Sequence, residues 1–588
     1  MIISVVQKRF LHITTHHLQN IQKYIYAMNR AYLRHKPSTE GDKFDISFQL
    51  VDPEFKVDRN FNFTRSLDEN VSTFLSRITT NVEKAYAKKN KRKKKSPDAV
   101  EDQTPAVSVS LYCNLIKINE EVPCNQVFKE KNSVTLKLFD KEYEVVINAP
   151  FIESITLPSS ILPNFPVYPL KFEALYYDEK YSVFAWYKSH DKKEWEQIGT
   201  EYICTPGDDA IGCYLKMVCI PRNEHHEGPK IEVISDGVVS PTPGVFPFER
   251  RHEFTKSRSK TKEFRVVTYN ILADLYCDSD HTRTVLYPYC PPHALAIDYR
   301  KQLFMKEIIG YNSDIVCLQE VDRKIFNFDL QPVMERQGFG AEFAIKGGQV
   351  AEGLACFYRK DKFKLISSVK LHLAEQLQQY IIFKDFLQAI CANDKLKQRF
   401  NDRQTVTQVV TLECLETRNL VIVANTHLYF HPDADHIRLL QGAMSMRFVE
   451  DYYNKTKSHL EYKDKKISIV FCGDFNSVPD NGIYKLFTEG SVGEDYADWS
   501  SNKEEQVKNL TLSQPFKMAS ACGTPPYTNY TVGFADCLDY IFFDTNTVHV
   551  TQHVPMPTND ELIFHAALPS VVFPSDHVSL CADLKWNE

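Results

Sequence analysis

The stretch Ile469-Val-Phe-Cys-Gly-Asp474-Phe-Asn476-Ser places a carboxylate and a carboxamide directly after an apolar run. The run covers residues 467–472, has the length of a strand, and stops at Gly473. Residues two apart point the same way in an extended exit from a strand, so Asp474 and Asn476 project together. Such a pair can hold a hard cation and orient a water, although the same letters also make ordinary turns.

Polar residues recur where other apolar runs of the same region begin or end. They are Asn270, Glu320, His427, Asp539, Asp576 and His577. Each alone is explained by a cap, a turn or a structural histidine. Their recurrence within one region is hard to explain by capping, and clustered strand ends are where a rigid scaffold presents chemistry.

The residue types indicate which chemistry this is. The chain has no Gly-x-Ser-x-Gly elbow, no Walker loop and no dinucleotide fingerprint. Carboxylates and amides suit Mg²⁺, or Mn²⁺, better than Zn²⁺. A hard metal, a water-activating carboxylate and histidines that stabilise anionic oxygens predict a phosphodiester hydrolase.

These residues lie in a region of alternating strands and helices, residues 263–588, which predicts one α/β layered domain. Strands are predicted at 264–269, 315–319, 354–358, 406–415, 420–426, 467–472, 540–543 and 578–584. Helices are predicted near 299–309, 378–399 and 437–453.

The preceding region has a period of two and predicts a smaller β-sandwich accessory domain over residues 101–240. Its Trp186, Asp209 and Tyr214 loosely resemble the Trp, Asp and Tyr of immunoglobulin-like sandwiches. Residues 241–262 are expected to be a linker to the catalytic region. We therefore expect an α+β chain whose chemistry lies in its C-terminal half.

The N-terminal region is basic. No acidic residue precedes Glu40, which predicts a mitochondrial targeting leader over residues 1–40 and a place in the matrix; the alternative is a disordered basic tail. Residues 41–100 are a poorly defined segment that ends in the basic block 88–95. That block is interpreted as a solvated linker, with an RNA-attracting arm or a nuclear signal as alternatives.

Composition sets broad limits. The 588 residues are too many for one core, and the net charge of −6 argues against nucleic-acid binding over the whole surface. The 15 cysteines include no Cys-x-x-Cys pair, so neither a zinc framework nor a disulfide scaffold is expected. No run of eighteen apolar residues is present, so no membrane span is expected.

Seven short motifs, in order, resemble those of the endonuclease/exonuclease/phosphatase superfamily. They are Tyr269-Asn-Ile-Leu-Ala-Asp274, Leu318-Gln-Glu-Val-Asp322, Glu352-Gly-Leu-Ala, Asn425-Thr-His-Leu428, Gly473-Asp-Phe-Asn-Ser477, Leu538-Asp-Tyr-Ile-Phe542 and Ser575-Asp-His577. Tyr287-Pro-Tyr-Cys-Pro and Asp298-Tyr-Arg-Lys-Gln resemble the deadenylase branch. The resemblance implies a four-layer α/β sandwich over residues 263–588.

The resemblance also implies roles for residues. Glu320, Asp474 and Asn476 are the implied metal ligands, for Mg²⁺ with Mn²⁺ as an alternative. The implied catalytic residues are Asn270, His427, Asp474, Asn476, Asp539, Asp576 and His577. Among these, Asp474 is expected to orient or deprotonate the attacking water, and the two histidines to stabilise the phosphorane-like charge.

An adenine clamp is implied at Pro432 and Phe534, with Asn529 near the scissile phosphate. Phe430 and Ala535 depart from the residues common in relatives, which are Trp and a small Gly or Lys. The implied function is Mg²⁺-dependent 3′-exoribonuclease and phosphodiesterase hydrolysis of 2′,5′-oligoadenylate and 3′,5′ poly(A) to AMP, with RNA and neither DNA nor a membrane as partner. The alternatives are a phosphatase on a small phosphorylated metabolite and a non-catalytic RNA-binding protein.

Overall fold

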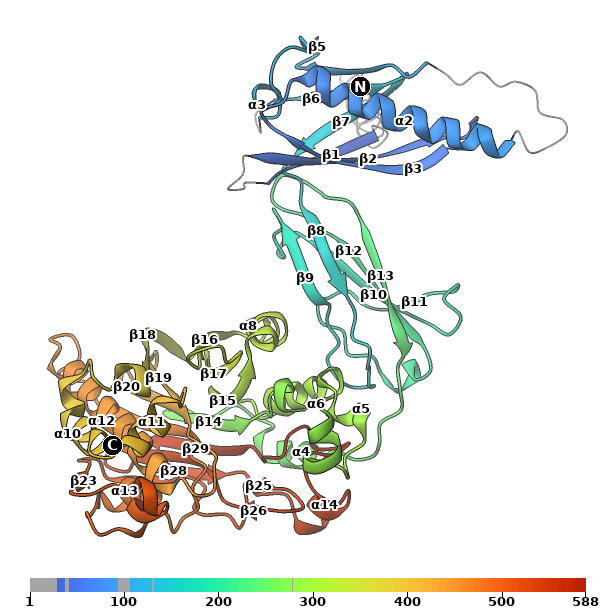
Figure 1. Ribbon diagram of the computed structural model, residues 1–588. Coiled ribbons are helices and arrows are strands. Elements are labelled where there is room, and N and C mark those ends of the chain that lie inside the picture. Colours follow the sequence, from blue (N-terminus) through green and yellow to red (C-terminus); the bar gives the residue numbers. More distant parts are fainter. Residues whose placement is uncertain (1–28, 37–41, 56, 94–105, 130–131, 278) are drawn as a thin grey trace, which may run out of the picture. The chain divides into compact units, whose positions relative to one another are not determined.

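The computed structural model describes residues 29–36, 42–55, 57–93, 106–129, 132–277 and 279–588 (Figure 1). The chain divides into two compact units, and both contribute segments to the β-rich middle region. Within the described ranges, no helix combines the length and the apolar character that a bilayer span requires. The first 28 residues of the expected leader lie outside the described residues.

The N-terminal region forms a seven-stranded sheet in the order β3-β2-β1-β7-β6-β4-β5 (Figure 1). Its strands are β1 (Asn29–Lys36), β2 (Lys43–Asp52), β3 (Val57–Ser66), β4 (Val109–Cys113), β5 (Ile116–Lys117), β6 (Val134–Leu138) and β7 (Lys141–Ile147). Its helices are α2 (Val71–Lys93) and the short α3 (Cys124–Val127). Every second residue of β2 is buried, from Phe44 to Leu50, and this row packs against Phe74 and Ile78 of α2.

This sheet corrects two boundaries that the sequence suggested. Residues 29–36, expected in the leader, form β1, which pairs with β2 on one side and β7 on the other. The strands of residues 109–147 belong to the same sheet and not to a β-sandwich that begins at 101. The basic block also differs from expectation, because α2 continues through Lys93; residues 94–105 lie outside the described ranges.

Apart from one 3-10 turn, η1 (Asp208–Ala210), the regular elements of the middle region are strands, as its period-two pattern predicts. A two-stranded sheet joins β8 (Phe151–Thr156) and β9 (Leu170–Leu175). A four-stranded sheet has the order β11-β10-β12-β13, from β10 (Val183–Ser189), β11 (Glu196–Gly199), β12 (Tyr214–Ile220) and β13 (Ile231–Val238). Trp186 of β10 is fully buried.

The C-terminal region contains two six-stranded sheets. The first has the order β16-β17-β15-β14-β29-β28, and the second β18-β19-β20-β21-β27-β24. The strands of the first are β14 (Glu263–Asn270), β15 (Ile315–Asp322), β16 (Phe339–Ile345), β17 (Glu352–Arg359), β28 (Val548–His553) and β29 (Leu580–Trp586). Those of the second are β18 (Phe363–His372), β19 (Val406–Cys414), β20 (Leu420–His427), β21 (Ile467–Asp474), β24 (Met518–Ser520) and β27 (Asp539–Asp544).

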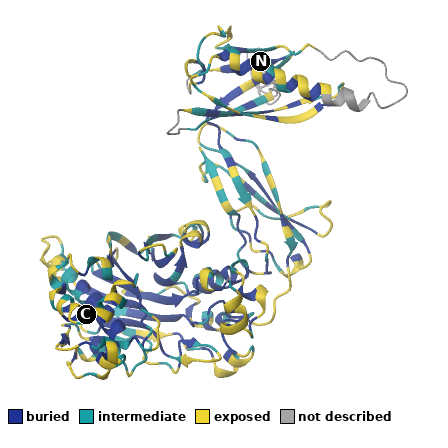
Figure 2. Cartoon of the chain, in the orientation of Figure 1, coloured by how far each residue is buried: buried dark blue, intermediate teal, exposed yellow. Residues whose placement is uncertain are grey.

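The two sheets share one apolar core. This core contains Val266 and Cys317 from the first sheet and Val423 and Cys472 from the second. The C-terminal region as a whole holds most of the buried residues (Figure 2). The helices of this region are α4 (Pro247–His252), α5 (Pro292–Leu295), α6 (Ile297–Gly310), α7 (Arg323–Ile325), α8 (Gln331–Arg336), α9 (Leu373–Gln376), α10 (Lys384–Cys391), α11 (Asp394–Asn401), α12 (Asp435–Ser458), α13 (Gly482–Glu489) and α14 (Asn559–Ile563).

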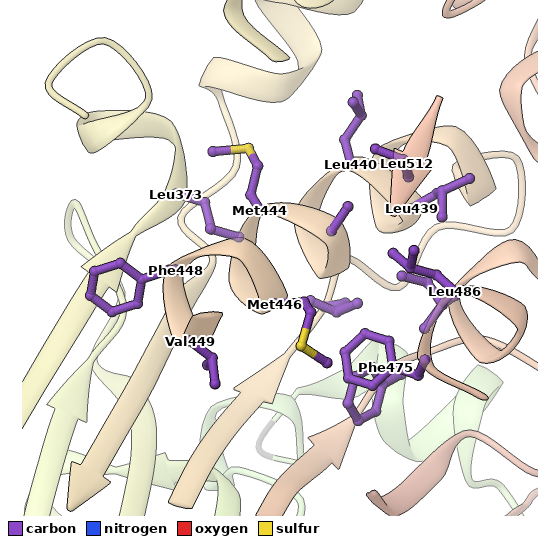
Figure 3. Packing of buried hydrophobic residues seen from close by; sticks show 14 of the residues in the cluster. Leu373, Leu439, Leu440, Met444, Met446, Phe448, Val449, Phe475, Leu486 and Leu512 are labelled. Carbon is purple, nitrogen blue, oxygen red and sulfur yellow. The ribbon is translucent and has the colours of Figure 1, made fainter. Parts of the chain in front are cut away.

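A second apolar cluster lies between α12, α13 and the outer face of the second sheet. Figure 3 shows part of it, with Met446 of α12 beside Phe475 and Leu486. On the outer face of the first sheet, Tyr269 hydrogen-bonds Glu307 of α6. Helices therefore cover both outer faces, which confirms the expected four-layer α/β sandwich.

Candidate active site

The predicted residues meet because parallel strands end together. Strands β14 and β15 are parallel in the first sheet, and β20 and β21 are parallel in the second. In the register of the second sheet, Asp474 stands opposite His427 of β20 and opposite Asp539, where antiparallel β27 begins. The carboxyl ends of four strands and the start of a fifth thus carry most of the polar residues that the sequence singled out, and Asp576 and His577 lie in the loop before β29.

Gly473 allows the closest of these approaches. Its φ is +151°, and a Cβ at this position would lie 2.2 Å from the carbonyl oxygen of Thr426 on β20. A larger residue would push β20 and β21 apart. Glycine therefore holds His427 and Asp474 side by side.

Glu320 projects from an irregularity in β15. The pairing of β15 with β17 shifts register between Leu318 and Val321, and Glu320 has a φ of +56°. The Nδ2 of Asn270 donates to Glu320 Oε1 at 2.9 Å and to Asp474 Oδ2 at 3.0 Å. One carboxamide therefore ties together acidic residues from the two different sheets.

Both acidic residues are held where a charge is costly. Burial, followed by the charges of Asp576 and Glu352, raises the pKa of Glu320 to about 7. Burial and then Asp539 raise the pKa of Asp474 to about 6. Carboxylates gathered without enough cations to balance them are suited to binding a positive ion.

The donor set fits a divalent cation. Ligand oxygens of Asp474 and Asp539 lie within 4.8 Å of each other, with His577 beside them. The Oδ1 of Asp539 is buried without a hydrogen-bond partner, so it can accept a cation. Glu320 and Asp474, joined through Asn270, offer a second carboxylate-rich position, the one that the family resemblance implies.

The two histidines differ in charge preference. The Nδ1 of His577 lies 2.7 Å from Asp539 Oδ2, and its Nε2 lies 3.6 Å from Asp474 Oδ2. Burial alone lowers the pKa of an imidazole, but neighbouring carboxylates, led by Asp539, raise the pKa of His577 well above its ordinary value. Burial, then Lys346, lowers the pKa of His427 well below its ordinary value. The surroundings therefore favour the protonated form of His577 and the neutral form of His427.

Asp576 and Asn529 lie together beside this centre. The Nδ2 of Asn529 donates to Asp576 Oδ2 at 3.3 Å, and the hydroxyl of Tyr287 donates to the same oxygen at 2.9 Å. Tyr287 belongs to the deadenylase-like motif, whose residues had no predicted role. It orients Asp576 next to His577.

Asn476 is held in place through both its backbone and its side-chain carboxamide. Its backbone N–H donates to Asp474 Oδ1 at 2.9 Å, and its Nδ2 donates to the carbonyl oxygen of Leu428 at 2.9 Å. Its φ of +49° is one that asparagine tolerates. Its predicted role as a metal ligand stays a prediction.

Sequence reasoning missed a cation in this centre. Lys346 follows β16, and its Nζ lies 3.4 Å from His427 Nδ1 and 2.5 Å from Glu352 Oε1. The hydroxyl of Tyr276, a half-exposed residue at the same side, lies 3.4 Å from Glu352 Oε1. Lys346 also lies at the end of a strand, as the other residues of the centre do. It was missed because β16 (Phe339–Ile345) was not predicted from the sequence.

Arg300 connects the loops that carry the centre. It is fully buried, and its Nη1 donates to the carbonyl oxygens of Leu272 at 2.7 Å and Pro574 at 3.3 Å. These loops follow Asn270 and precede Asp576. The side chain therefore fixes the two loops against each other without reaching the centre.

The implied adenine clamp lies on two exposed loops. Phe534 is 46% exposed in the turn between β25 (Asn529–Tyr530) and β26 (Ala535–Asp536), so it stands close in the fold to Asn529. Pro432 is exposed on the loop that leaves β20 after His427. Their grip on a base remains a prediction.

Comparisons with known proteins agree with this geometry. A model described as Endonuclease/Exonuclease/phosphatase family matches residues 267–577, and one described as 2′,5′-phosphodiesterase 12-like, N-terminal domain, matches residues 149–240. The chain is 38% identical to 2′,5′-phosphodiesterase 12 of Mus musculus, over 96% of this chain and 95% of the relative. The Homo sapiens protein of that name is 38% identical over 95% of both chains.

More distant similarity covers about half of the chain. The CCR4-Not complex 3′-5′-exoribonuclease subunit Ccr4 of Schizosaccharomyces pombe is 29% identical over 56% of this chain and 50% of its own length. The family model spans more than half of the chain, and its matched range contains every residue of the buried centre. The chain is therefore an enzyme that belongs to the endonuclease/exonuclease/phosphatase family.

Proposed function

We propose that the chain is a Mg²⁺-dependent phosphodiesterase that shortens adenylate chains from the 3′ end and releases AMP. The proposed substrates are 2′,5′-oligoadenylate and the 3′,5′ linkage of poly(A). Similarity to a 2′,5′-phosphodiesterase and to a 3′-5′-exoribonuclease supports the two linkages, and the implied adenine clamp supports the base. The observation that carries the proposal is the convergence of Asn270, Glu320 and Asp474 from two sheets beside His577, whose Nε2 lies 3.6 Å from Asp474 Oδ2.

The side chains have two roles: one activates the attacking water, and the others stabilise charge on the phosphate. With a pKa of about 6, Asp474 is largely ionised at neutral pH and basic enough to take a proton from the attacking water. Asp539 accepts from His577 Nδ1, so His577 directs its Nε2–H into the centre, where negative charge develops on the phosphorane. Lys346 and neutral His427 present further donors there.

Enzymes of this family depend on a metal ion, and Mg²⁺ is the proposed ion because the donor set is mainly carboxylate and carboxamide oxygen. Glu320, Asp474 and Asn476 would hold it, with Asp539 available nearby. When bound, a divalent cation stabilises charge on the phosphate oxygens and lowers the pKa of a bound water.

The test compares three substrates with and without EDTA. Purified protein is given 2′,5′-triadenylate, 3′,5′-oligoadenylate and a panel of small phosphate monoesters. Stepwise release of AMP from both oligoadenylates, lost in EDTA and restored by Mg²⁺, is the expected result. Turnover of monoesters alone would favour a metabolite phosphatase, and binding of oligoadenylate without turnover would favour a non-catalytic protein.

We further propose that the chain works in the mitochondrial matrix, where an RNA substrate would meet it. The proposal is supported by the acid-free N-terminal residues before Glu40. A reporter protein fused to the N-terminal residues tests it.

A further inference from the structure

A helical insert, residues Leu373–Arg403, interrupts the second sheet between β18 and β19 and has no sequence motif. It contains α9, η6 (Ile381–Phe383), α10 and α11. Its apolar side chains, including Phe386 and Ile390, join the same cluster as Met444 and Phe448 of α12. Figure 3 shows Leu373 of α9 with these two α12 residues. Arg447 of α12 lies 2.6 Å from Asp385. The insert is thus packed firmly onto α12.

The far end of the insert reaches the loop that follows the catalytic His427. We call residues Tyr429–Asp433 the clamp loop, because they carry Pro432. The Nη2 of Arg399 lies 2.5 Å from Asp433 Oδ1, and its Nη1 lies 3.3 Å from Asp433 Oδ2, which makes a two-pronged pair. The guanidinium of Arg403 lies 4.6 Å from the centre of the Tyr429 ring.

Other contacts fix the backbone of the clamp loop. Arg438 of α12 donates to the carbonyl oxygens of Tyr429 at 3.1 Å and His431 at 2.6 Å. Asn502 donates to Asp433 Oδ2 at 3.0 Å. Yet Phe430 of this loop is 70% exposed. A backbone held from several sides that turns an aromatic ring to solvent is pre-organised for a flat ligand.

The two ends of the insert also approach the turn after Lys346. A Cβ placed on Gly347 would lie 2.2 Å from Gln404 Oε1 and 2.7 Å from Glu375 Oε1. Glu375 is at the start of the insert, and Gln404 directly follows its end. The insert therefore contacts both the turn that carries the active-site lysine and the loop that carries the predicted base contact.

We propose that the helical insert is the base-specificity element of this enzyme, and that Arg399 is its positioning residue for the clamp loop. Arg399 touches none of the reacting groups. It fixes Asp433, one residue beyond Pro432, and so sets where the loop meets an adenine. The inference rests on the proposed adenylate phosphodiesterase activity and deepens it by assigning base selection to a segment outside the family motifs.

The test measures base discrimination in variants of the full chain. Arg399→Gln and Asp433→Asn each remove one side of the pair, and Arg399→Lys keeps the charge. Each is assayed with 2′,5′-oligoadenylate, 2′,5′-oligouridylate and bis(p-nitrophenyl) phosphate. Arg258→Gln is the matched control, because Arg258 makes a similar two-pronged pair with Asp361, at 2.8 Å for both contacts, away from the clamp loop.

We expect Arg399→Gln and Asp433→Asn to lower kcat/KM for oligoadenylate about ten- to a hundredfold, mainly through KM, because a displaced loop misplaces the base. The ratio of adenylate to uridylate turnover falls with it, while cleavage of the small diester stays within about twofold of wild type. Arg399→Lys restores part of the ratio, and the control keeps all of it.

The inference is overturned if the adenylate-to-uridylate ratio is unchanged in both variants, or if all three substrates lose turnover in proportion, as general damage to the fold would cause. If Arg399→Gln does not fold, Asp433→Asn and Arg399→Lys decide the matter by the same ratio. Wild-type enzyme that cleaves the small diester but neither oligonucleotide would instead overturn the proposed function itself.

Discussion

At the scale of single residues, the two histidines of the centre differ in the charged groups that surround them. Both face Asp474, at 3.5 Å for His427 Nε2 and 3.6 Å for His577 Nε2. Asp539 supports only His577, and Lys346 opposes a charge only on His427. The motifs do not distinguish the two histidines, but their neighbours favour the protonated form of His577 and the neutral form of His427.

Glu320→Gln should abolish metal-dependent hydrolysis, with a loss of at least about a hundredfold, while leaving the fold intact. A carboxyl whose pKa is raised to about 7 contributes unfavourably to stability once pH rises above its unfolded pKa, and fully above pH 7. In EDTA at pH 8, the Tm of the variant should therefore equal or exceed that of wild type. Calorimetry with and without Mg²⁺ checks this.

Added Mg²⁺ should raise the Tm of wild type by mass action and leave Glu320→Gln unmoved. Glu342→Gln, on β16 beyond the centre, serves as the control and should behave as wild type. Near-normal hydrolysis of oligoadenylate by Glu320→Gln would contradict the metal assignment.

Lys346→Gln should lower kcat/KM for oligoadenylate and for bis(p-nitrophenyl) phosphate alike, by about ten- to a hundredfold. The reason is that Lys346 stands beside His427, where the proposed function places the phosphodiester. Because the change also leaves Glu352 without its cation, the double variant Lys346→Gln/Glu352→Gln separates lost phosphate binding from a stranded buried charge. Recovery of full activity in the double variant would refute a direct role for Lys346.

Phe534→Ala should show the opposite pattern between substrates. Loss of stacking should weaken oligoadenylate turnover about ten- to a hundredfold. The small diester, which needs no base pocket, should be cleaved almost as before. A clamp on the base does not sense the sugar linkage, so 2′,5′ and 3′,5′ substrates should decline together. Kinetics on the three substrates would reject the clamp if only one linkage suffers.

At the scale of elements, Gly473→Ala tests how β20 and β21 align the centre. A methyl group would meet the carbonyl oxygen of Thr426 at 2.2 Å, and the φ of +151° is unfavourable for alanine. We expect a loss of about 1–3 kcal/mol in the free energy of unfolding and a larger proportional loss of activity. Urea denaturation and oligoadenylate kinetics measure the two effects.

Gly493→Ala is the matched control, because no atom lies within 4 Å of a Cβ there. It should change the free energy of unfolding by less than about 0.5 kcal/mol. Equal behaviour of the two alanine variants would show that Gly473 does not govern the strand spacing.

The strands that carry the chemistry were predictable because they are buried on both faces. Every residue of β14, β20 and β21 is buried, so each appears in the sequence as an apolar run with a clear end. Strand β18 was missed because its polar residues, such as Ser367 and Ser368, break that pattern. The predicted helix at 378–399 is two helices, because Asn393 caps the start of α11 with its side chain.

The site was predictable as a set of residue types, and its contacts were not. Asn270 and Asp474 are 204 residues apart and meet only when the two sheets pack. The N-terminal boundary failed for the same reason, since β1 pairs with β7 across more than a hundred residues. Local periodicity carries no information about such pairings.

At the scale of the whole molecule, the relatives share more than the catalytic region. The chain aligns with 95% of the length of the mouse and human relatives, and a separate model covers residues 149–240. Regions without catalytic residues are therefore retained together with the centre. The N-terminal sheet limits how many N-terminal residues can be removed from the chain. Its first described strand, β1, lies inside the sheet and not at an edge.

Strand β1 lies between β2 and β7 and bonds to both, through Ala31–Lys36 and Asn29–Leu33 respectively. Removal of residues 1–28 spares this strand, whereas removal of residues 1–40 exposes the unpaired edges of β2 and β7. We therefore expect a reporter fused to residues 1–28 to enter mitochondria. The mature chain recovered from them should begin at or before Asn29, as mass spectrometry of its N-terminus would show.

Purified protein without residues 1–28 should match the full chain in Tm and in oligoadenylate turnover. Protein without residues 1–40 should lose the cooperative unfolding of the N-terminal region and tend to aggregate, because a central strand cannot be replaced by a neighbour in the same register. The two truncations differ by one strand and a short connection, so the comparison isolates β1. A cytosolic reporter would refute the leader, and a mature N-terminus within residues 30–40 would show that β1 is dispensable.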